Sequence, residues 1–431
     1  MKVYSVGGSV RDIIMNRKIH DRDYVVVGAT VEDMLAQGFR PVGKEFPVFL
    51  HPETKEEYAL ARTEKKVAPG YKGFVFHTDP SVTLEEDLVR RDLTINAIAM
   101  DENGEITDPF NGRQDIENKI LRHVSTAFRE DPVRILRLAR FSARYTDFTI
   151  APETMELMKD MVNNGEVDAL VPERIWKELS VGLMEEKPSR MIDVLHDCGA
   201  LARIFPEIEA LWGVTQPENW HPEIYADRHT MLALDYSAKQ GFPLPVRFGV
   251  LLHDLGKGTT PRNQWPHHRA HEERGAVIVE QLCRRLHVSN FYRETAVMIA
   301  REHGMIRRSI ELPSKLSVMV LERCDAFRRP ERFKYVIDAT ECDLRGRGYG
   351  EKSTENIPFP QRKYWETILA AVAKVNAGEI VQSLGEDAYD IDIPRLLHDA
   401  RADAASDAII EMKFGKVRKV SALGGAPISE R

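Results

Sequence analysis

The first 128 or so residues place apolar positions in short runs separated by turn-forming residues. These runs are rich in Val, Tyr and Leu, and such a pattern is typical of strands in an α/β domain. The pattern predicts strands at residues 3–6, 24–27, 48–50 and 58–61.

From Glu130 onward the apolar positions recur with the period of helices, and strand signals nearly vanish. Prolines divide this part into short helices. Residues 211–227 contain prolines and an asparagine and are predicted to be a linker, after which His229 opens a further apolar helix. The sequence therefore predicts an α/β N-terminal head at 1–128, followed by all-α regions at 129–227, 228–329 and 330–431.

Composition narrows the class of protein. The 431 residues include 43% hydrophobic and 29% charged side chains, which is ordinary for a globular chain. No apolar run is long enough to cross a bilayer, and no signal peptide is visible, so we expect no membrane partner. The four cysteines are far apart and form no CxxC pair, which fits the reducing cytoplasm. The net charge of −7 argues weakly against a nucleic-acid partner, because local patches decide such binding.

Two acidic residues precede the strand predicted at 24–27. Alternation along a strand places Asp21 and Asp23 on one face and Arg22 on the other. Neighbouring carboxylates repel unless cations lie between them, and Mg²⁺ prefers oxygen ligands. Two ions about 3.5–4 Å apart can activate an attacking hydroxyl and stabilise a leaving pyrophosphate. We predict that Asp21 and Asp23, on an edge strand, are catalytic Mg²⁺ ligands; the alternative is a solvated strand end.

A glycine turn lies upstream of this acidic pair. Residues 6–12 read Val-Gly-Gly-Ser-Val-Arg-Asp, which indicates a strand, a Gly-Gly turn and a helix. Such a turn lets backbone N–H groups approach a phosphate closely. We therefore predict that Gly8 and Arg11 bind a nucleotide triphosphate, with the guanidinium acting as a fork.

These residues resemble a known family. Residues 6–12 followed by Asp21-Arg22-Asp23 are similar to the first motif of the class II tRNA nucleotidyltransferase/poly(A) polymerase family, within the polymerase-β superfamily. Residues 90–97, Arg-Arg-Asp-Leu-Thr-Ile-Asn-Ala, resemble the family's RRDxTxNA motif, and residues 130–134 resemble its EDxxR motif. The resemblance implies a polymerase-β-like head with Mg²⁺ at Asp21 and Asp23.

The resemblance also implies roles for the later motifs. Arg91 would bind phosphate, while Asp92 and Asn96 would bind ribose. Asp131 and Arg134 would hydrogen-bond the Watson–Crick edge of an incoming C or A, as a protein template. Further expected contacts are Arg137 and Arg140 to nucleotide or phosphate, and Glu57 as a third acidic position.

Arginines recur along the segment after Glu130. Arg134, Arg137, Arg140 and Arg144 are spaced by three, three and four residues, which places them on one face of a helix. A face of unpaired arginines is costly unless anions meet it. The alternative is an ordinary solvated helix face.

A histidine-rich pattern follows in the second half. An adjacent His253-Asp254 within an apolar helix needs partners for two polar groups, and a divalent metal supplies them. With His229 it resembles the H…HD…D pattern of the HD phosphohydrolase superfamily. By spacing we prefer Asp325 over Asp343 as the last ligand. Nearby histidines that can bind phosphate or a second metal are His267, His268, His271 and His303.

Mixed His/Asp ligands admit Ni²⁺, Mn²⁺, Fe²⁺ or Mg²⁺. In tRNA nucleotidyltransferases that carry such a domain, the resemblance implies 2′,3′-cyclic phosphodiesterase, 2′-nucleotidase and phosphatase activities, with a transition metal such as Ni²⁺. The alternative is a purely structural helical domain. One departure is Ala270, where relatives tend to have Gly.

Together these features predict an enzyme that adds CCA to the 3′ end of tRNA from CTP and ATP without a nucleic-acid template. We expect it to act in the cytoplasm, as a monomer or homodimer, with Mg²⁺ in the head. The alternatives are a poly(A) polymerase of the same family, an HD phosphohydrolase with an inactive head, and a non-catalytic RNA-binding protein.

Overall fold

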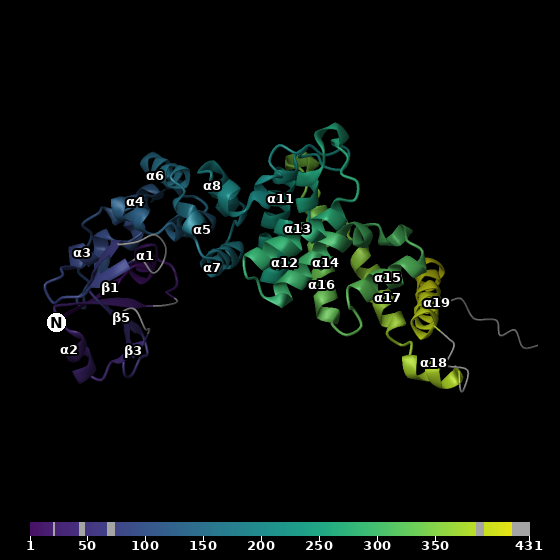
Figure 1. Cartoon of the computed structure of the whole chain (residues 1–431), viewed down its shortest axis with the longest axis horizontal. Coiled ribbons are helices and arrows are strands. Elements are labelled where there is room, and N and C mark those ends of the chain that lie inside the picture. Colours follow the sequence, from purple (N-terminus) through teal and green to yellow (C-terminus); the bar gives the residue numbers. More distant parts are fainter. Residues whose placement is uncertain (20–21, 43–47, 67–73, 385–391, 416–431) are drawn as a thin grey trace, which may run out of the picture.

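The computed structural model describes residues 1–19, 22–42, 48–66, 74–384 and 392–415. The chain forms an elongated molecule, with a mixed head at the N-terminal end and helices along the rest (Figure 1). This matches the α/β head and all-α remainder that the sequence predicts.

A seven-stranded sheet forms the centre of the head, in the order β3-β4-β5-β2-β1-β8-β9. Among the described strands of this sheet, β2 and β5 are the one parallel pair. All four strands predicted from sequence are present, and β2 is the middle strand rather than an edge strand. The strands of this sheet are β1 (Lys2–Val6), β2 (Asp23–Val27), β3 (Arg40–Val42), β4 (Val48–Leu50), β5 (Glu57–Leu60), β8 (Ala99–Met100) and β9 (Ile106–Thr107).

The sheet is covered on both faces, which explains why β2 is apolar at consecutive positions. Val25 packs into one core cluster with Val6 and Leu88, whereas Val26 packs into another with Met34 and Phe49. Two short sheets accompany it: β6 (Thr63–Lys66) with β7 (Phe74–His77), and β10 (Ile120–Leu121) with β11 (Thr149–Ile150). The head helices are α1 (Gly8–Ile14), α2 (Val31–Ala36), α3 (Leu84–Val89), α4 (Gly112–Asn118) and the 3₁₀ turn η1 (Thr94–Asn96).

A helical middle region follows the head. Its first long helix, α5, packs against α7 and α8 and turns its arginines toward the head. The other face of α5 is apolar, and Ile135, Leu138 and Ala139 are fully buried. The elements are η2 (Thr126–Glu130), α5 (Val133–Arg144), α6 (Pro152–Asn163), η3 (Glu166–Ala169), α7 (Pro172–Leu183), α8 (Ser189–Asp197), α9 (Ala200–Ile204) and α10 (Pro206–Glu209).

The second helical region is built on α11, α12, α14 and α16, which pack on one another. The helix that was predicted to open at His229 begins three residues earlier. The elements of this second helical region are α11 (Ala226–Lys239), α12 (Leu244–Leu252), η4 (Leu255–Thr259), η5 (Arg262–Gln264), α13 (His271–Arg285), α14 (Asn290–Arg307) and α16 (Pro330–Arg345).

The C-terminal helices form the far end of the molecule (Figure 1). There α19 packs on α15 and α17, around the fully buried Trp365. One continuous core cluster extends from Leu93 in the head to Ala408 in α19. The elements are η6 (Ser309–Glu311), α15 (Ser314–Arg323), η7 (Gly350–Lys352), α17 (Gln361–Val372), α18 (Ala377–Leu384) and α19 (Ile393–Phe414).

The buried face of α5 holds the head against the middle helices. Leu138 is fully buried, so Leu138→Ala should lower the free energy of unfolding by about 2–5 kcal/mol. Urea unfolding followed by tryptophan fluorescence measures the change. The control is Val277→Ala, because Val277 is 58% exposed and should change stability by less than about 0.5 kcal/mol. Equal effects of the two variants would contradict this packing.

Candidate active sites

A cavity of about 1530 Å³ lies between the head and α5 and α7. Gly7 and Gly8, at the turn between β1 and α1, line it together with Asp23 and Glu57. Gly7 has φ 69, and a Cβ there would lie 3.1 Å from the guanidinium of Arg91. Glycine is therefore needed at this position both for the turn and for the close approach of Arg91.

Carboxylates gather at the edge of this cavity. Asp23 begins β2 and pairs in register with Glu57 on β5 and with Val6 on β1, next to the glycine turn. Asp23 and Glu57 are both exposed and line the cavity. Asp21 lies outside the described residues, so the predicted Asp21–Asp23 pair stays a prediction.

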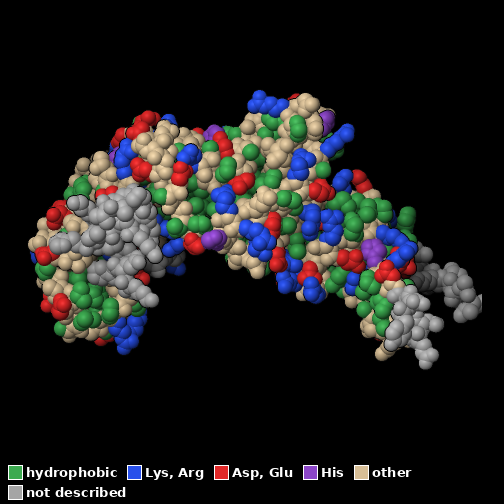
Figure 2. Space-filling view, viewed as in Figure 1, with side chains coloured by type: hydrophobic (Ala, Val, Ile, Leu, Met, Phe, Trp, Pro, Cys, Tyr) green, Lys and Arg blue, Asp and Glu red, His purple; other side chains and the backbone are tan. Residues whose placement is uncertain are grey.

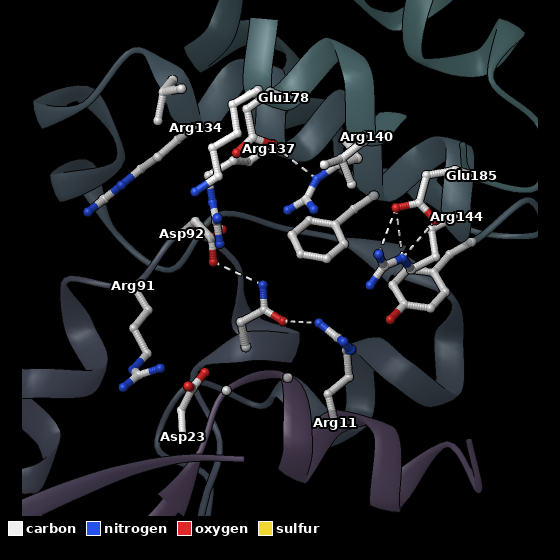
Figure 3. A pocket seen from close by; sticks show the side chains of 18 of the residues that line it. Arg11, Asp23, Arg91, Asp92, Arg134, Arg137, Arg140, Arg144, Glu178 and Glu185 are labelled. Atoms are coloured by element: carbon white, nitrogen blue, oxygen red, sulfur yellow. Dashed lines mark hydrogen bonds and ion pairs between the residues drawn. The ribbon is translucent and has the colours of Figure 1, made fainter. Parts of the chain in front are cut away.

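A chain of hydrogen bonds joins the first two sequence motifs to helix α5 across the cavity (Figure 3). Arg11 Nη1 donates to Asn96 Oδ1 at 2.6 Å, and Asn96 Nδ2 donates to Asp92 Oδ1 at 3.0 Å. Arg137 Nε on α5 donates to Asp92 Oδ2 at 2.9 Å. The predicted ribose-binding residues thus connect α1 to α5, and they hold the two arginines in fixed positions.

Asp92 is buried and negatively charged. Burial acts to raise its pKa, but the charge of Arg137 and the hydrogen bond from Asn96 outweigh burial. The pKa of Asp92 therefore lies well below its ordinary value of 3.8. The carboxylate stays ionised, and it carries the charge that pairs with Arg137.

The arginines of α5 line one face of the cavity, as predicted, but they are not unpaired (Figure 3). Arg140 Nε lies 3.0 Å from Glu178 Oε2 of α7, and Arg144 Nη2 lies 2.7 Å from Glu185 Oε1. Arg134 donates to the carbonyl oxygen of Ala127 at 2.8 Å. The acidic partners come from α7 and the turn after it, which sequence spacing along α5 does not reveal. These acidic side chains compensate the positive charge of the arginines without a bound anion.

Arg174 was missed by the sequence analysis. Its two terminal nitrogens donate to both carboxylate oxygens of Asp131, at 2.9 and 2.6 Å. Such a bidentate pair holds the carboxylate in one plane. Arg174 lies in the first turn of α7, 43 positions from Asp131, and no local pattern marks it.

A second site lies within the α11–α16 region. His229 of α11, His253 and Asp254 after α12, and Asp343 of α16 converge there, and all are buried. His229 Nε2 lies 3.1 Å from Asp343 Oδ1, and His253 Nε2 lies 3.1 Å from Asp254 Oδ2. The predicted convergence of His229 with the His253-Asp254 pair is therefore present.

Asp325, the last ligand preferred from sequence, does not join this cluster among the described residues. Asp325 has φ 53 on the turn after α15, where it pairs with Arg328 at 2.6 Å and lies 3.6 Å from Arg332. Asp343, the alternative weighed from sequence, takes that place because α16 packs along α11 and α12. Spacing alone could not decide between the two, since both follow α14.

The segment predicted as a linker, 211–227, supplies two more buried groups. Glu223 Oε1 lies 2.9 Å from His229 Nδ1 and 3.1 Å from His221 Nδ1. Hydrogen bonds from both histidines outweigh burial and hold the pKa of Glu223 below its ordinary value. Glu223 thereby directs the other nitrogen of His229 toward Asp343. The sequence signal that was overlooked is the pair of His221 and Glu223 on either side of Pro222.

The second site suits a divalent metal. Among the described residues, His229 Nε2, His253 Nε2 and Asp254 Oδ1 are buried and make no well-aligned hydrogen bond, although a carboxylate oxygen lies 3.1 Å from each of the two nitrogens. Lys257 and Arg347 supply positive charge to Asp254 and Asp343, respectively. Nitrogen and carboxylate ligands together fit a transition metal. His267, by contrast, is exposed and joins none of the clusters of possible ligands in the described residues.

Positive and negative side chains alternate over the face shown in Figure 2, in keeping with the small net charge. Within the described residues, no helix combines the length and the apolar character needed to cross a lipid bilayer.

Family models match three parts of the chain. Residues 3–122 match the poly A polymerase head domain, residues 147–211 match the probable RNA and SrmB-binding site of polymerase A, and residues 221–338 match the HD domain. The fold and these matches define a nucleotidyltransferase head joined to an HD domain. Both kinds of domain use divalent metals.

Curated relatives identify the family more closely. The chain is 57% identical over 416 residues to the multifunctional CCA protein of Herminiimonas arsenicoxydans, covering 96% of this chain and 99% of the relative. It is 58% identical over 412 residues to that of Janthinobacterium sp. (strain Marseille), covering 95% and 98%. The chain belongs to the family of multifunctional CCA proteins.

Solved structures share the fold. The CCA-adding enzyme of Bacillus stearothermophilus in complex with CTP superposes with a TM-score of 0.62 at 21% identity, covering 94% of this chain and 88% of that chain. The Thermotoga maritima enzyme complexed with tRNA gives a TM-score of 0.58 at 19% identity, covering 95% and 91%.

The Asp92–Arg137 pair should stabilise the head in a pH-dependent way. Asp92→Asn should cost about 1–3 kcal/mol at pH 7, less than a fully buried pair because Arg137 is 37% exposed. The folded-state pKa of Asp92 is lowered, so its contribution is present above pH of about 4 and is lost as pH falls further. The difference in Tm between variant and wild type should therefore shrink at low pH.

The control is Asp168→Asn, which removes an exposed partner of Arg203 and should change stability by about 0–1 kcal/mol. Thermal unfolding at pH 7, 5 and 3.5 measures both variants. A pH-independent difference for Asp92→Asn would show that its charge is not the cause.

Proposed function

We propose that the head cavity adds C, C and A in turn to the 3′ end of tRNA, using CTP and ATP. The observation that carries this proposal is the shape of one cavity: acidic side chains at one edge face a row of oriented arginines and an Asp–Arg pair on the other side (Figure 3). The membership in the family of multifunctional CCA proteins supports the same activity.

The acidic edge is the proposed place of phosphoryl chemistry. Asp23, with Asp21 and Glu57, would hold Mg²⁺, since this hard cation takes carboxylate and phosphate oxygens. Mg²⁺ bound there would polarise the triphosphate and stabilise the leaving pyrophosphate. Arg11 lies beside Gly8 and Arg91 beside Gly7 at this end of the cavity, where their guanidinium groups can orient phosphate oxygens.

The opposite side of the head cavity is the proposed place of base selection. Asp131 offers acceptors and Arg134 offers donors, the pair of functions that a Watson–Crick edge requires. Because Arg174 holds the Asp131 carboxylate in one plane, its free lone pairs have a fixed direction. Arg174 is thus a proposed positioning residue. Arg137 and Arg140 would contact the nucleotide from the same helix, where Asp92 and Glu178 hold them.

The α11–α16 site is proposed to hydrolyse phosphoester bonds, as 2′,3′-cyclic phosphodiesterase, 2′-nucleotidase and phosphatase. His229, His253, Asp254 and Asp343 would hold a divalent metal such as Ni²⁺, which the nitrogen and oxygen ligands favour. Such a metal activates water as a nucleophile near neutral pH. We expect the chain to act on tRNA in the cytoplasm, as a monomer or homodimer.

The two sites should be separable by mutation. Asp23→Ala should reduce CMP and AMP incorporation into tRNA lacking its CCA end on the order of 10³-fold or more, because a ligand of the reacting metals is lost. His253→Ala should spare incorporation and remove phosphatase activity. Incorporation of each nucleotide, with the product sequenced, and phosphate release measure the two activities.

The control for the head is Glu32→Ala, an exposed residue on α2. Parallel loss of both activities in each variant would contradict the separation of the sites. Long A tails on the product would identify a poly(A) polymerase instead.

Asp343 and Asp325 provide a direct test of the metal ligands. Asp343→Asn should lower metal affinity and phosphatase activity by at least about 10–100-fold, because a charged ligand is replaced by an amide. Asp325→Asn should leave both unchanged, since Asp325 pairs only with arginines among the groups described around it. Metal content after dialysis and phosphate release are the measurements. If Asp325→Asn lost its metal and Asp343→Asn kept it, Asp325 would be the metal ligand, as the sequence predicts.

A further inference from the structure

We propose that Trp220 stacks on the terminal base of an RNA strand whose phosphate lies in the α11–α16 site. Trp220, Tyr225 and Tyr349 together form an exposed group that we call the aromatic rim. This inference rests on the proposed phosphohydrolase function. It names the substrate of that site as an unpaired RNA end, recognised by its base as well as by its phosphate.

The side chains of the aromatic rim are large and open to solvent. Trp220 is 69% exposed, Tyr349 57% and Tyr225 43%. They lie on two segments, the loop at 214–225 and the turn at 346–350. Single exposed apolar residues are ordinary, whereas a group of them on adjoining segments marks an interaction site. Exposed aromatic rings offer flat faces on which an unpaired nucleobase stacks.

Hydrogen bonds join the two segments that carry the rim. Arg347 Nη1 donates to the carbonyl oxygen of Trp220 at 2.9 Å, and the backbone N–H of Gly348 donates to Glu223 Oε2 at 3.1 Å. Gly348 has φ 66, and a Cβ there would lie 2.1 Å from the carbonyl oxygen of Lys352, so this turn needs glycine. The loop and the turn therefore hold the aromatic rings on one framework.

The same framework places Trp220 at the edge of the proposed metal site. Arg347 Nη2 pairs with Asp343 Oδ1, so one guanidinium connects the histidine–aspartate cluster to the backbone of Trp220. Trp220 also directly precedes His221, whose ring centroid lies 4.7 Å from that of His229. Consecutive Cα atoms are only about 3.8 Å apart. The base of a nucleotide whose phosphate lies at the cluster is thus within reach of the Trp220 ring.

The loop at 214–225 has its conformation before any ligand binds. Ile224 has φ 70, which is rare for a β-branched residue. Its N–H donates to the carbonyl oxygen of His221 at 2.8 Å, and its own carbonyl oxygen accepts from the Gln216 N–H at 2.7 Å. Such strained positions persist where surrounding contacts impose them, and they cluster at ligand-binding segments. A preformed loop loses little further freedom when a base stacks on it.

Positive charge beside the loop favours a nucleic acid as the occupant over a protein. The segment 261–270 lies against the loop, where His268 Nε2 is 2.9 Å from the carbonyl oxygen of Thr215. Arg262 and Arg269 on this segment are exposed, and neither pairs with a carboxylate in the described part of the chain. Phosphates of the strand that leads to the terminal base can pair with these guanidinium groups.

Photocrosslinking locates the base directly. The metal-stripped protein is irradiated with a short single-stranded RNA that ends in 4-thiouridine 2′,3′-cyclic phosphate, and crosslinked peptides are mapped by mass spectrometry. We expect crosslinks at 214–225 or 346–350, reduced about 5-fold or more in Trp220→Ala and largely kept in Trp220→Phe. Because no metal is loaded, this readout does not depend on catalysis. Crosslinks confined to other peptides would overturn the inference.

Kinetics separate base stacking from a structural role. In the Ni²⁺-loaded protein, Trp220→Ala should raise KM for adenosine 2′-phosphate about 5-fold or more and leave kcat nearly unchanged, because stacking is lost while the metal ligands remain. The KM for glycerol 2-phosphate, which has no base, should stay at the wild-type value. The matched control is Phe414→Ala, which removes a 78% exposed ring at the end of α19 and should change neither KM.

The outcomes distinguish this inference from the proposed function. If Trp220→Ala raised KM equally for both phosphate esters, the inference would be wrong and the phosphohydrolase function would stand. If wild type hydrolysed neither ester, both would be wrong. If Trp220→Ala left both KM values unchanged and instead dissociated a dimer in analytical ultracentrifugation, the rim would be an interface between two copies of the chain.

Discussion

The contact between Asp92 and Arg137 is the interaction on which the head cavity depends. Asp92 is buried, so its charge must be compensated, and Arg137 and Asn96 do this from two different elements. The same network reaches Arg11 in the glycine turn. One buried carboxylate thus links the side of the cavity that is proposed to select the base with the side that is proposed to receive the phosphates.

Buried charge must also be compensated in the second site, but the groups that surround the charge there are different. In the head, arginines and acids from neighbouring helices neutralise one another, and Arg140 with Glu178 is an example. Around Asp254, histidines outnumber permanent cations, and several of their nitrogens lack hydrogen-bond partners in the described residues. Protein groups alone satisfy the first arrangement. The second arrangement has the nitrogen and carboxylate groups that suit a divalent metal ion.

The residues of both sites that lie close together along the chain could be predicted from the sequence. The glycine turn, the row of arginines on α5 and the His253-Asp254 pair follow from local spacing, and so do four strands of the sheet. What it missed is set by packing between distant elements. Arg174 and Glu223 are paired across helices and turns, and no local period records such contacts. The sequence could not show that Asp343, rather than Asp325, lies beside the histidines, because the packing of α16 on α11 and α12 places it there.

The head cavity and the histidine–aspartate cluster of the α11–α16 region occupy different stretches of an elongated molecule and share no residue among those described (Figure 1). A single RNA terminus can occupy one of them at a time. Under the proposed function, an RNA end processed in the helical region would have to leave it before the head could extend it. Extension would then compete with escape of the RNA into solution.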